Sequence, residues 1–250
     1  MFDYKMIRNL IAALMGFVLG SGKSRAEAPT PNADSENEPW VDKLQWLPEN
    51  HDNNPFNEEV LDCRTVALGF TSTTSDPAIA TAFVNSRNDD GRSYIGKLPE
   101  NVYSIDSEIR FPYNGNREDG VIYFAKEMED KWDFYAYDSK LYIRRSWTGV
   151  LLHVLELRYT DTEVIVVKIH SEGNTVYRDS DYTKAHVNFL INTHFAEKVI
   201  PFPTPPVFTR ETKKAIALSG FNSYGRRAQF GAIPKLPVEQ GGDTKTDPPS

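Results

Sequence analysis

Two arginines and two tryptophans are the residues whose types and spacing best suit a ligand site. Arg144 and Arg145 come just before Trp147, and Trp132 lies on a neighbouring predicted strand. Arginine beside an aromatic ring is common at binding surfaces, because the guanidinium stacks on the ring while it donates hydrogen bonds to an anion. We therefore predict a ligand- or partner-binding site lined by these four residues. The simpler explanation is structural, with the arginines in cross-strand charge pairs that include Glu156.

The histidines and the single cysteine form no pattern that predicts a metal site. His186 and His194 are two turns apart on a predicted helix, whereas a helical zinc site pairs histidines at i and i+4. His194 falls on the apolar stripe of that helix, so we expect a histidine of the core. His153 and His170 lie on neighbouring strands without a third ligand. Cys63 excludes an intrachain disulfide and is expected to be a buried apolar residue, and we predict no metal and no cofactor.

A run of hydroxyl groups at residues 69–75 gives the most specific hint of an enzyme. Its Ser72-Thr73-Thr74 triplet resembles the Phe-x-Ser-Thr-Ser strand end of arginine-type ADP-ribosyltransferases. That resemblance implies an NAD site with an upstream arginine on the cofactor and a downstream Glu-x-Glu on the sugar. Here the nearest upstream arginine, Arg64, is too close, and Asp161-Thr162-Glu163 replaces Glu-x-Glu, with Asp106 and Glu108 at a similar spacing. The simpler interpretation is a strand edge and a turn before a helix capped by Asp76.

Composition indicates a globular domain with flanking segments. Of the 250 residues, 40% are hydrophobic and 25% are charged, which is ordinary for a chain that buries a core. The net charge of −7 argues against binding nucleic acid through its phosphates and suits a basic protein partner. We predict a single domain over residues 40–233, after an apolar segment and polar linker at 1–39. Residues 234–250 have the composition of a disordered tail.

The N-terminal segment has two interpretations. Residues 10–20 are a continuous apolar run, too short to span a bilayer but long enough for the core of a signal peptide, with small residues ending at Ala28. Lys23 and Arg25 place positive charge on the side that would be translocated, which argues against export. We favour a cytoplasmic protein whose uncleaved segment docks on the domain or associates with a membrane surface. The alternative is export with cleavage after Ala28.

Alternating β-branched and aromatic residues predict a sheet in the middle of the chain. Asp138-Ser139 and Thr148-Gly149 are predicted as two-residue hairpin turns between successive strands. Trp132 and Phe134 are expected on one face, and Ile143 and Arg145 on another. The predicted strands cover residues 120–125, 131–137, 141–147, 150–159 and 163–169.

Two helices are predicted to accompany the sheet. Asp76 and Pro77 are an N-cap and a first helical residue, and they predict a short helix to about Ser86. Asp181 is predicted to cap a second helix that reaches Phe195, with apolar residues at helical spacing. The chain after Pro201 is expected to be extended, followed by a last short helix or strand. These elements predict the α+β class, with an antiparallel meander of about five or six strands packed on one side by the second helix.

Several motifs also carry a resemblance to a family of bacterial proteins with no known activity. They are Met128-Glu129-Asp130-Lys131-Trp132-Asp133, Lys140-Leu141-Tyr142 and Arg145-Ser146-Trp147-Thr148-Gly149, continued by Phe189-Leu190-Ile191, His194, Phe202-Pro203 and residues 223–227. The resemblance implies a bacterial accessory protein and supplies no catalytic residue. We therefore expect a non-enzymatic interaction protein, of immunity type in its most specific form. The alternative is an ADP-ribosyltransferase-like enzyme that uses NAD.

Overall fold

A six-stranded antiparallel sheet is the centre of the fold, as the alternating pattern predicts. The computed structural model describes residues 38–72, 76–173 and 178–233, and these form an α+β structure. The strands follow the order β3-β8-β7-β6-β5-β4, so β8 lies inside the sheet and β3 and β4 are its edges. Their bounds are β3 Tyr103–Pro112, β4 Gly120–Tyr123, β5 Trp132–Tyr137, β6 Lys140–Arg145, β7 Leu151–Tyr159 and β8 Glu163–Ser171.

A smaller four-stranded sheet and several helices complete the structure. The small sheet has the order β1-β2-β10-β9, and its β9–β10 pair is parallel. Its strands are β1 Gln45–Leu47, β2 Val60–Asp62, β9 Phe202–Pro203 and β10 Phe230–Ala232. The helices are α2 Arg64–Gly69, α3 Pro77–Ser86, α4 Ser180–His194 and α5 Lys213–Tyr224, with short 3-10 helices η1 Val41–Lys43, η2 Arg92–Tyr94 and η3 Gly225–Arg227.

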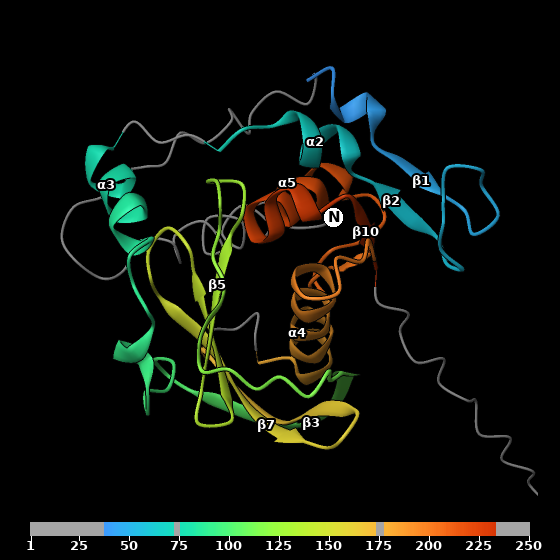
Figure 1. Ribbon diagram of the computed structural model, residues 1–250. Helices are drawn as coiled ribbons and strands as arrows, with labels where there is room; N and C mark the ends of the chain where they lie inside the picture. The colour runs from blue at the N-terminus through green and yellow to red at the C-terminus, as the bar shows by residue number, and fades with distance from the viewer. Residues whose placement is uncertain (1–37, 73–75, 174–177, 234–250) are drawn as a thin grey trace, which may run out of the picture.

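Helices α4 and α5 lie together on one side of the large sheet, and α3 lies far from them (Figure 1). Phe134 on β5 contacts His194 at the end of α4, with ring centroids 4.8 Å apart, and Trp132 contacts His186 at 5.4 Å. The main hydrophobic cluster joins this face to both helices and to the small sheet. The predicted packing of the second helix on one side of the sheet is therefore confirmed.

The two halves of the β5–β6 hairpin share faces, which corrects the prediction that they differ. Phe134 pairs with Ile143, and Trp132 pairs with Arg145. Directly paired residues of antiparallel strands point to the same side of a sheet. These four side chains therefore all lie on the face that α4 and α5 cover, which we call the inner face.

The two predicted hairpin turns have different outcomes. Asp138 and Ser139 form a two-residue turn, and both have positive φ values of 50° and 59°. The Thr148-Gly149 prediction is wrong, because residues 146–149 form a longer loop between Arg145 and Val150. Only Gly149 has positive φ there, whereas a two-residue type I′ turn needs it at both positions, and β-branched Thr148 disfavours it. A bulge between Ile143 and Arg144 also shifts the register, so that Arg144 pairs with Leu151.

Helix α3 begins as predicted, and α4 begins earlier than predicted. The Asp76 side chain accepts a hydrogen bond from the Ala78 amide, 2.8 Å away, which confirms the cap. The cap of α4 is Asp179, which accepts from the Tyr182 amide at 2.7 Å, and Asp181 lies in the first turn. Both aspartates suit a helix start, so the sequence alone does not distinguish them.

Strand β3 was not predicted, and the ends of the chain lie outside the described residues. Tyr103, Ile105, Ile109 and Phe111 alternate with exposed residues, which is typical of a half-buried strand, but the buried Ser107 and a bulge between Asp106 and Ile109 interrupt the pattern. The predictions for residues 1–37 and 234–250 fall outside the part that the structure describes. Within the described ranges, no helix has the length and apolar character needed to cross a membrane.

The Asp138-Ser139 turn gives a first prediction. Left-handed backbone costs a non-glycine residue about 1–2 kcal/mol, and glycine avoids this cost. We expect Ser139→Gly to raise the free energy of unfolding by about 0.5–1 kcal/mol in urea denaturation. Ser139→Ala is the matched control, because it removes the same hydroxyl and keeps the strained φ, and it should not stabilise the protein. Equal stabilities for the two variants would contradict this account of the turn.

Candidate functional site

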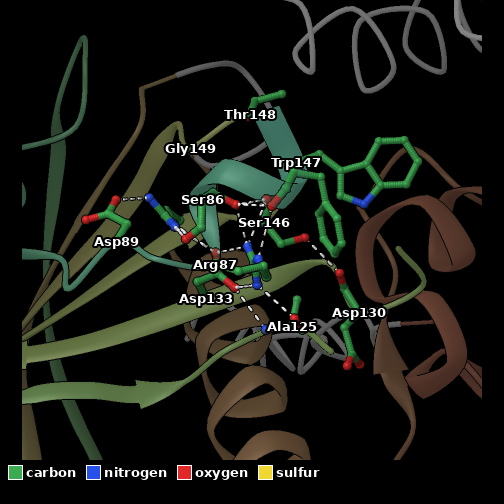
Figure 2. A network of polar contacts seen from close by, with 12 residues as sticks. Ser86, Arg87, Asp89, Ala125, Asp130, Asp133, Ser146, Trp147, Thr148 and Gly149 are labelled. Atoms are coloured by element: carbon green, nitrogen blue, oxygen red, sulfur yellow. Dashed lines mark hydrogen bonds and ion pairs between the residues drawn. The ribbon is translucent and has the colours of Figure 1, made fainter. Parts of the chain in front are cut away.

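A buried carboxylate, that of Asp133, joins the outer face of the sheet to the segment after α3. Its side chain has no exposed surface. The two terminal nitrogens of Arg87 donate to its two oxygens at 2.9 and 2.8 Å, and the Ala125 amide donates to Oδ1 at 2.9 Å. Figure 2 shows Arg87 between this carboxylate and the carbonyl oxygen of Ser146, which accepts a further hydrogen bond at 3.2 Å. The network therefore connects three separate stretches of chain.

Arg144, a predicted ligand-binding residue, belongs to the same network. Its Nε donates to Asp133 at 3.1 Å, and its terminal nitrogens donate to Asp89, to the Tyr94 hydroxyl at 2.9 Å and to the Ser86 carbonyl at 3.2 Å. Only 2% of its surface is exposed. The donors of Arg144 are thus directed at groups within the protein, which is the pattern of a structural arginine.

Arg145 and Trp132 hold the end of α5 on the inner face. The guanidinium of Arg145 lies 4.8 Å from the ring centroid of Trp132 and donates to the carbonyl oxygens of Asn222 and Ser223 at 2.9 and 3.1 Å. The Trp132 indole donates to the Ser223 carbonyl as well, at 2.7 Å. The C-terminal carbonyls of a helix lack partners within the helix, so these side chains satisfy them.

The four predicted site residues therefore do not line one surface. Arg144 points to the outer face and Arg145 to the inner face, because successive side chains of a strand alternate. Trp147 lies in the loop after β6, half-buried, and its indole donates to the Met128 carbonyl at 2.8 Å. Their contacts favour the structural explanation of this motif.

A cavity of about 370 Å³ lies where β4, the β4–β5 loop, the end of α4 and η3 meet. This volume is within the range of small-molecule and side-chain binding pockets. We call it the Arg227 pocket. It is lined by Leu68, Tyr123, Lys126, Glu127, Asp130, Thr193, His194, Glu197, Lys198, Val199, Arg226, Arg227 and Gln229.

A tyrosine hydroxyl links an arginine and an aspartate in this pocket. The Tyr123 hydroxyl donates to Asp130 Oδ2 at 3.0 Å and accepts from Arg227 at 2.9 Å. Burial raises the pKa of Tyr123 although Arg227 opposes the shift, so the group stays a phenol at neutral pH. The Nε of Arg227 is buried and donates to no acceptor among the described residues. Arg227 is thus oriented by Tyr123 and by an ion pair with Asp130 at 3.9 Å, and 27% of its side chain remains exposed.

His194 closes one side of the pocket as a neutral ring. Its Nδ1 lies 2.9 Å from the Leu190 carbonyl oxygen, which can only accept, so the proton is on Nδ1 and Nε2 carries the lone pair. Burial, and then the charge of Arg227, lowers the pKa of His194 to about 3. The prediction of a core histidine is consistent with this burial. Among the described residues, no group of three or more potential ligands could hold a metal ion.

No motif in the sequence indicates that the residues of the Arg227 pocket lie close together in the folded protein. Tyr123 and Asp130 are separated by about a hundred positions from Arg227, and strands β5 to β9 and helices α4 and α5 lie between them in the described chain. The paired arginines Arg226 and Arg227 lie in a motif already noted for its resemblance to a bacterial family. Only the strand order and the path of η3 bring this motif to β4.

The residues of the ADP-ribosyltransferase hypothesis have separate partners. Arg64 forms an ion pair with Asp62, and Glu163 forms one with Arg110. Ser72 is bound instead by Lys131, whose Nζ is 2.5 Å from the Ser72 hydroxyl. No contact found among the described residues joins Arg64, Ser72 and Glu163.

Comparison of the chain with protein-family models, with curated proteins and with solved structures finds no match. The resemblance to a bacterial family therefore stays a prediction.

The buried network predicts a large effect of removing one charge. Asp133→Asn leaves Arg144 buried without its full counter-charge, so we expect the free energy of unfolding to fall by about 3–5 kcal/mol in urea denaturation. Asp90→Asn is the control, since the Asp90–Arg92 ion pair is exposed and should change stability by less than about 0.5 kcal/mol. Similar decreases in the free energy of unfolding for both variants would contradict the large contribution of the buried network.

The depressed pKa of His194 predicts a stability that falls in acid. The folded state binds this proton at a pKa of about 3, whereas the unfolded chain binds it at about 6.5, so acid below about pH 6.5 favours the unfolded chain. One such histidine contributes up to about 1.4 kcal/mol per pH unit down to about pH 3. We expect His194→Gln to reduce the slope of unfolding free energy between pH 4 and 6 by about this amount. An unchanged slope would contradict the neutral, buried state of His194.

Proposed function

We propose that the protein acts as a binding protein and that the Arg227 pocket receives an acidic group of a protein partner. The observation that carries the proposal is the guanidinium of Arg227, held by the Tyr123 hydroxyl at the wall of a cavity, with 27% of the side chain exposed. A planar guanidinium held in place is the group best suited to bind a carboxylate through two hydrogen bonds.

The charge around the pocket supports an anionic occupant. Its cations are Lys126, Lys198, Arg226 and Arg227, and its anions are Glu127, Asp130 and Glu197, which leaves a local net charge of +1. The whole chain carries −7. A cavity with a positive balance inside an acidic molecule favours an anion locally, while the overall charge favours a partner with a basic surface around that anion.

Apolar side chains at the same pocket support a protein partner rather than a free small anion. Leu68 and Val199 both line it, and they are 56% and 51% exposed. Large apolar side chains beside charged ones are typical of a protein interface, where they lose contact with water on binding. A peptide segment with a carboxylate and an adjacent apolar side chain fits this lining.

An immunity-type role in a bacterium is the most specific form of this function that we propose. In that form the partner is a toxin, and the pocket contributes to a stoichiometric complex. The alternative of an NAD-using transferase has less support, because Arg64, Ser72 and Glu163 each have other partners.

A peptide-binding experiment tests the proposed function. The full chain is screened against a random peptide library, and enriched peptides are compared with analogues in which each carboxylate is replaced by an amide. We expect acidic peptides with an apolar neighbour to be enriched, and Arg227→Gln to weaken their binding at least about tenfold in fluorescence polarisation, which corresponds to about 1.4 kcal/mol.

Arg117→Gln is the matched control for this experiment. It removes the same charge from an exposed arginine that contacts Ser139 and Tyr159, and none of these three residues lines the pocket. We expect its peptide affinity to match that of the wild type. No preference for acidic peptides, or the same affinity in the Arg227→Gln variant, would refute the proposed site.

A further inference from the structure

Ser72, from the hydroxyl-rich run at 69–75, and Lys131, from the segment beginning at Met128, meet in the folded protein. Ser72 follows α2, and Lys131 comes just before β5. The Lys131 ammonium nitrogen lies 2.5 Å from the Ser72 hydroxyl oxygen, across 59 positions of sequence. A serine hydroxyl paired with a lysine amine is an arrangement for nucleophilic catalysis, in which the amine accepts the hydroxyl proton.

We propose that Ser72 and Lys131 form a nucleophile–base pair that transfers acyl groups from carboxylic esters. This activity is independent of peptide binding at the Arg227 pocket. The two sites lie on either side of one short segment, since Glu127 and Asp130 line the pocket while Lys131 contacts Ser72.

Lys131 is held in one position by its surroundings. Its nitrogen donates to the Met128 carbonyl oxygen at 2.9 Å and lies 4.7 Å from the ring centroid of Trp147 and 5.2 Å from that of Phe221. Only 5% of the residue is exposed. The Trp147 indole donates to the same Met128 carbonyl, so the aromatic wall and the lysine share one anchor. A base fixed in this way needs little reorganisation when it accepts a proton.

The environment of Lys131 makes its neutral form accessible at neutral pH. Burial, followed by the nearby charge of Arg145, lowers the pKa of Lys131 to about 7, although Glu129 and Asp130 oppose the shift. A neutral lysine has two N–H bonds and one lone pair. One N–H can donate to Met128 while the lone pair accepts the Ser72 hydroxyl proton, which satisfies both observed contacts.

Ser72 is held from the backbone side and remains partly accessible. Its amide donates to Glu129 Oε1 at 2.8 Å, and Glu129 itself is only 7% exposed. Ser72 is half-buried, and Lys131 is 5% exposed. Part of Ser72 therefore reaches solvent, while its base is shielded from water.

The reaction balances without a further reagent. The Ser72 oxygen attacks the ester carbonyl carbon and its proton passes to the Lys131 nitrogen. The bond from that carbon to the leaving alkoxy oxygen then breaks, and the Lys131 ammonium returns the proton to the departing alcohol. Water attacks the acyl-serine in the same manner, with Lys131 again as base, and releases the carboxylic acid and free Ser72.

Covalent labelling tests this proposal. The full chain is incubated with a fluorophosphonate probe, which phosphonylates nucleophilic serines, and the modified residue is identified by peptide mass spectrometry. We expect an adduct on Ser72 that forms faster as pH rises, with a midpoint near 7. Lys131→Met should slow it by about 100-fold or more, because general-base assistance is typically worth that factor. Ser139, whose hydroxyl accepts a hydrogen bond from the guanidinium of Arg117, is an internal reference, and we expect it to stay unmodified because an arginine cannot serve as the base.

The outcomes separate catalysis from a purely structural contact. The pH dependence is measured on the wild-type chain, so it stands even if Lys131→Met fails to fold. Absence of a Ser72 adduct in the wild type, a labelling rate that does not change with pH around 7, or equal rates in a folded Lys131→Met variant would overturn the proposal. Peptide binding in the Ser72→Ala variant is expected to match the wild type, so loss of labelling is distinguishable from loss of the proposed binding function.

Discussion

The arrangement of the described structure depends on the buried carboxylate of Asp133. Two arginines and a backbone amide donate to it, and a second aspartate, Asp89, balances the second arginine. Burying these charges is costly, and the cost is offset only when all of them are paired and hydrogen-bonded together. The network therefore specifies one position for the segment after α3 rather than merely adding stability.

The same carboxylate fixes the start of the segment between β4 and β5, from which both proposed sites are built. Ala125 is bound to Asp133 through its amide. Beyond it, Asp130 faces the Arg227 pocket and contacts Tyr123, while Glu129 and Lys131 face Ser72. One short segment thus presents carboxylates to two different surfaces.

Regular alternation made most of the large sheet predictable from the sequence. Strands β5 and β7 were recognisable because aromatic and branched residues recur along them, and the Asp76 cap located α3. In strand β3 a buried serine, Ser107, and the adjacent bulge interrupt the alternation. In the loop after β6, Thr148-Gly149 has the composition of a two-residue turn, although only Gly149 has positive φ. These errors affect one strand and one loop, whereas the predicted α+β class is confirmed.

The sites were much less predictable, for a different reason. Arg144 looked like a binding residue because a sequence does not distinguish an arginine that faces solvent from one that faces a buried aspartate. Arg227 and Lys131 were not predicted as site residues, since the groups that define their chemistry lie 104 and 59 positions away in the sequence. Contacts at that separation follow from topology, which composition and periodicity do not determine.

Gly225 shows how closely these distant parts depend on one another. It has a positive φ of 59°, and a Cβ atom there would lie 1.6 Å from the Glu129 carbonyl oxygen, so only glycine permits the contact. The close approach places η3 against the β4–β5 segment, and η3 carries Arg227 to Tyr123. The carbonyls just before Gly225 are bound by Arg145 on the inner face. Gly225, Arg145 and Arg227 therefore depend on one another. Arg145, which the sequence predicts as a binding residue, instead helps to position η3, and η3 carries the arginine that we propose binds the partner.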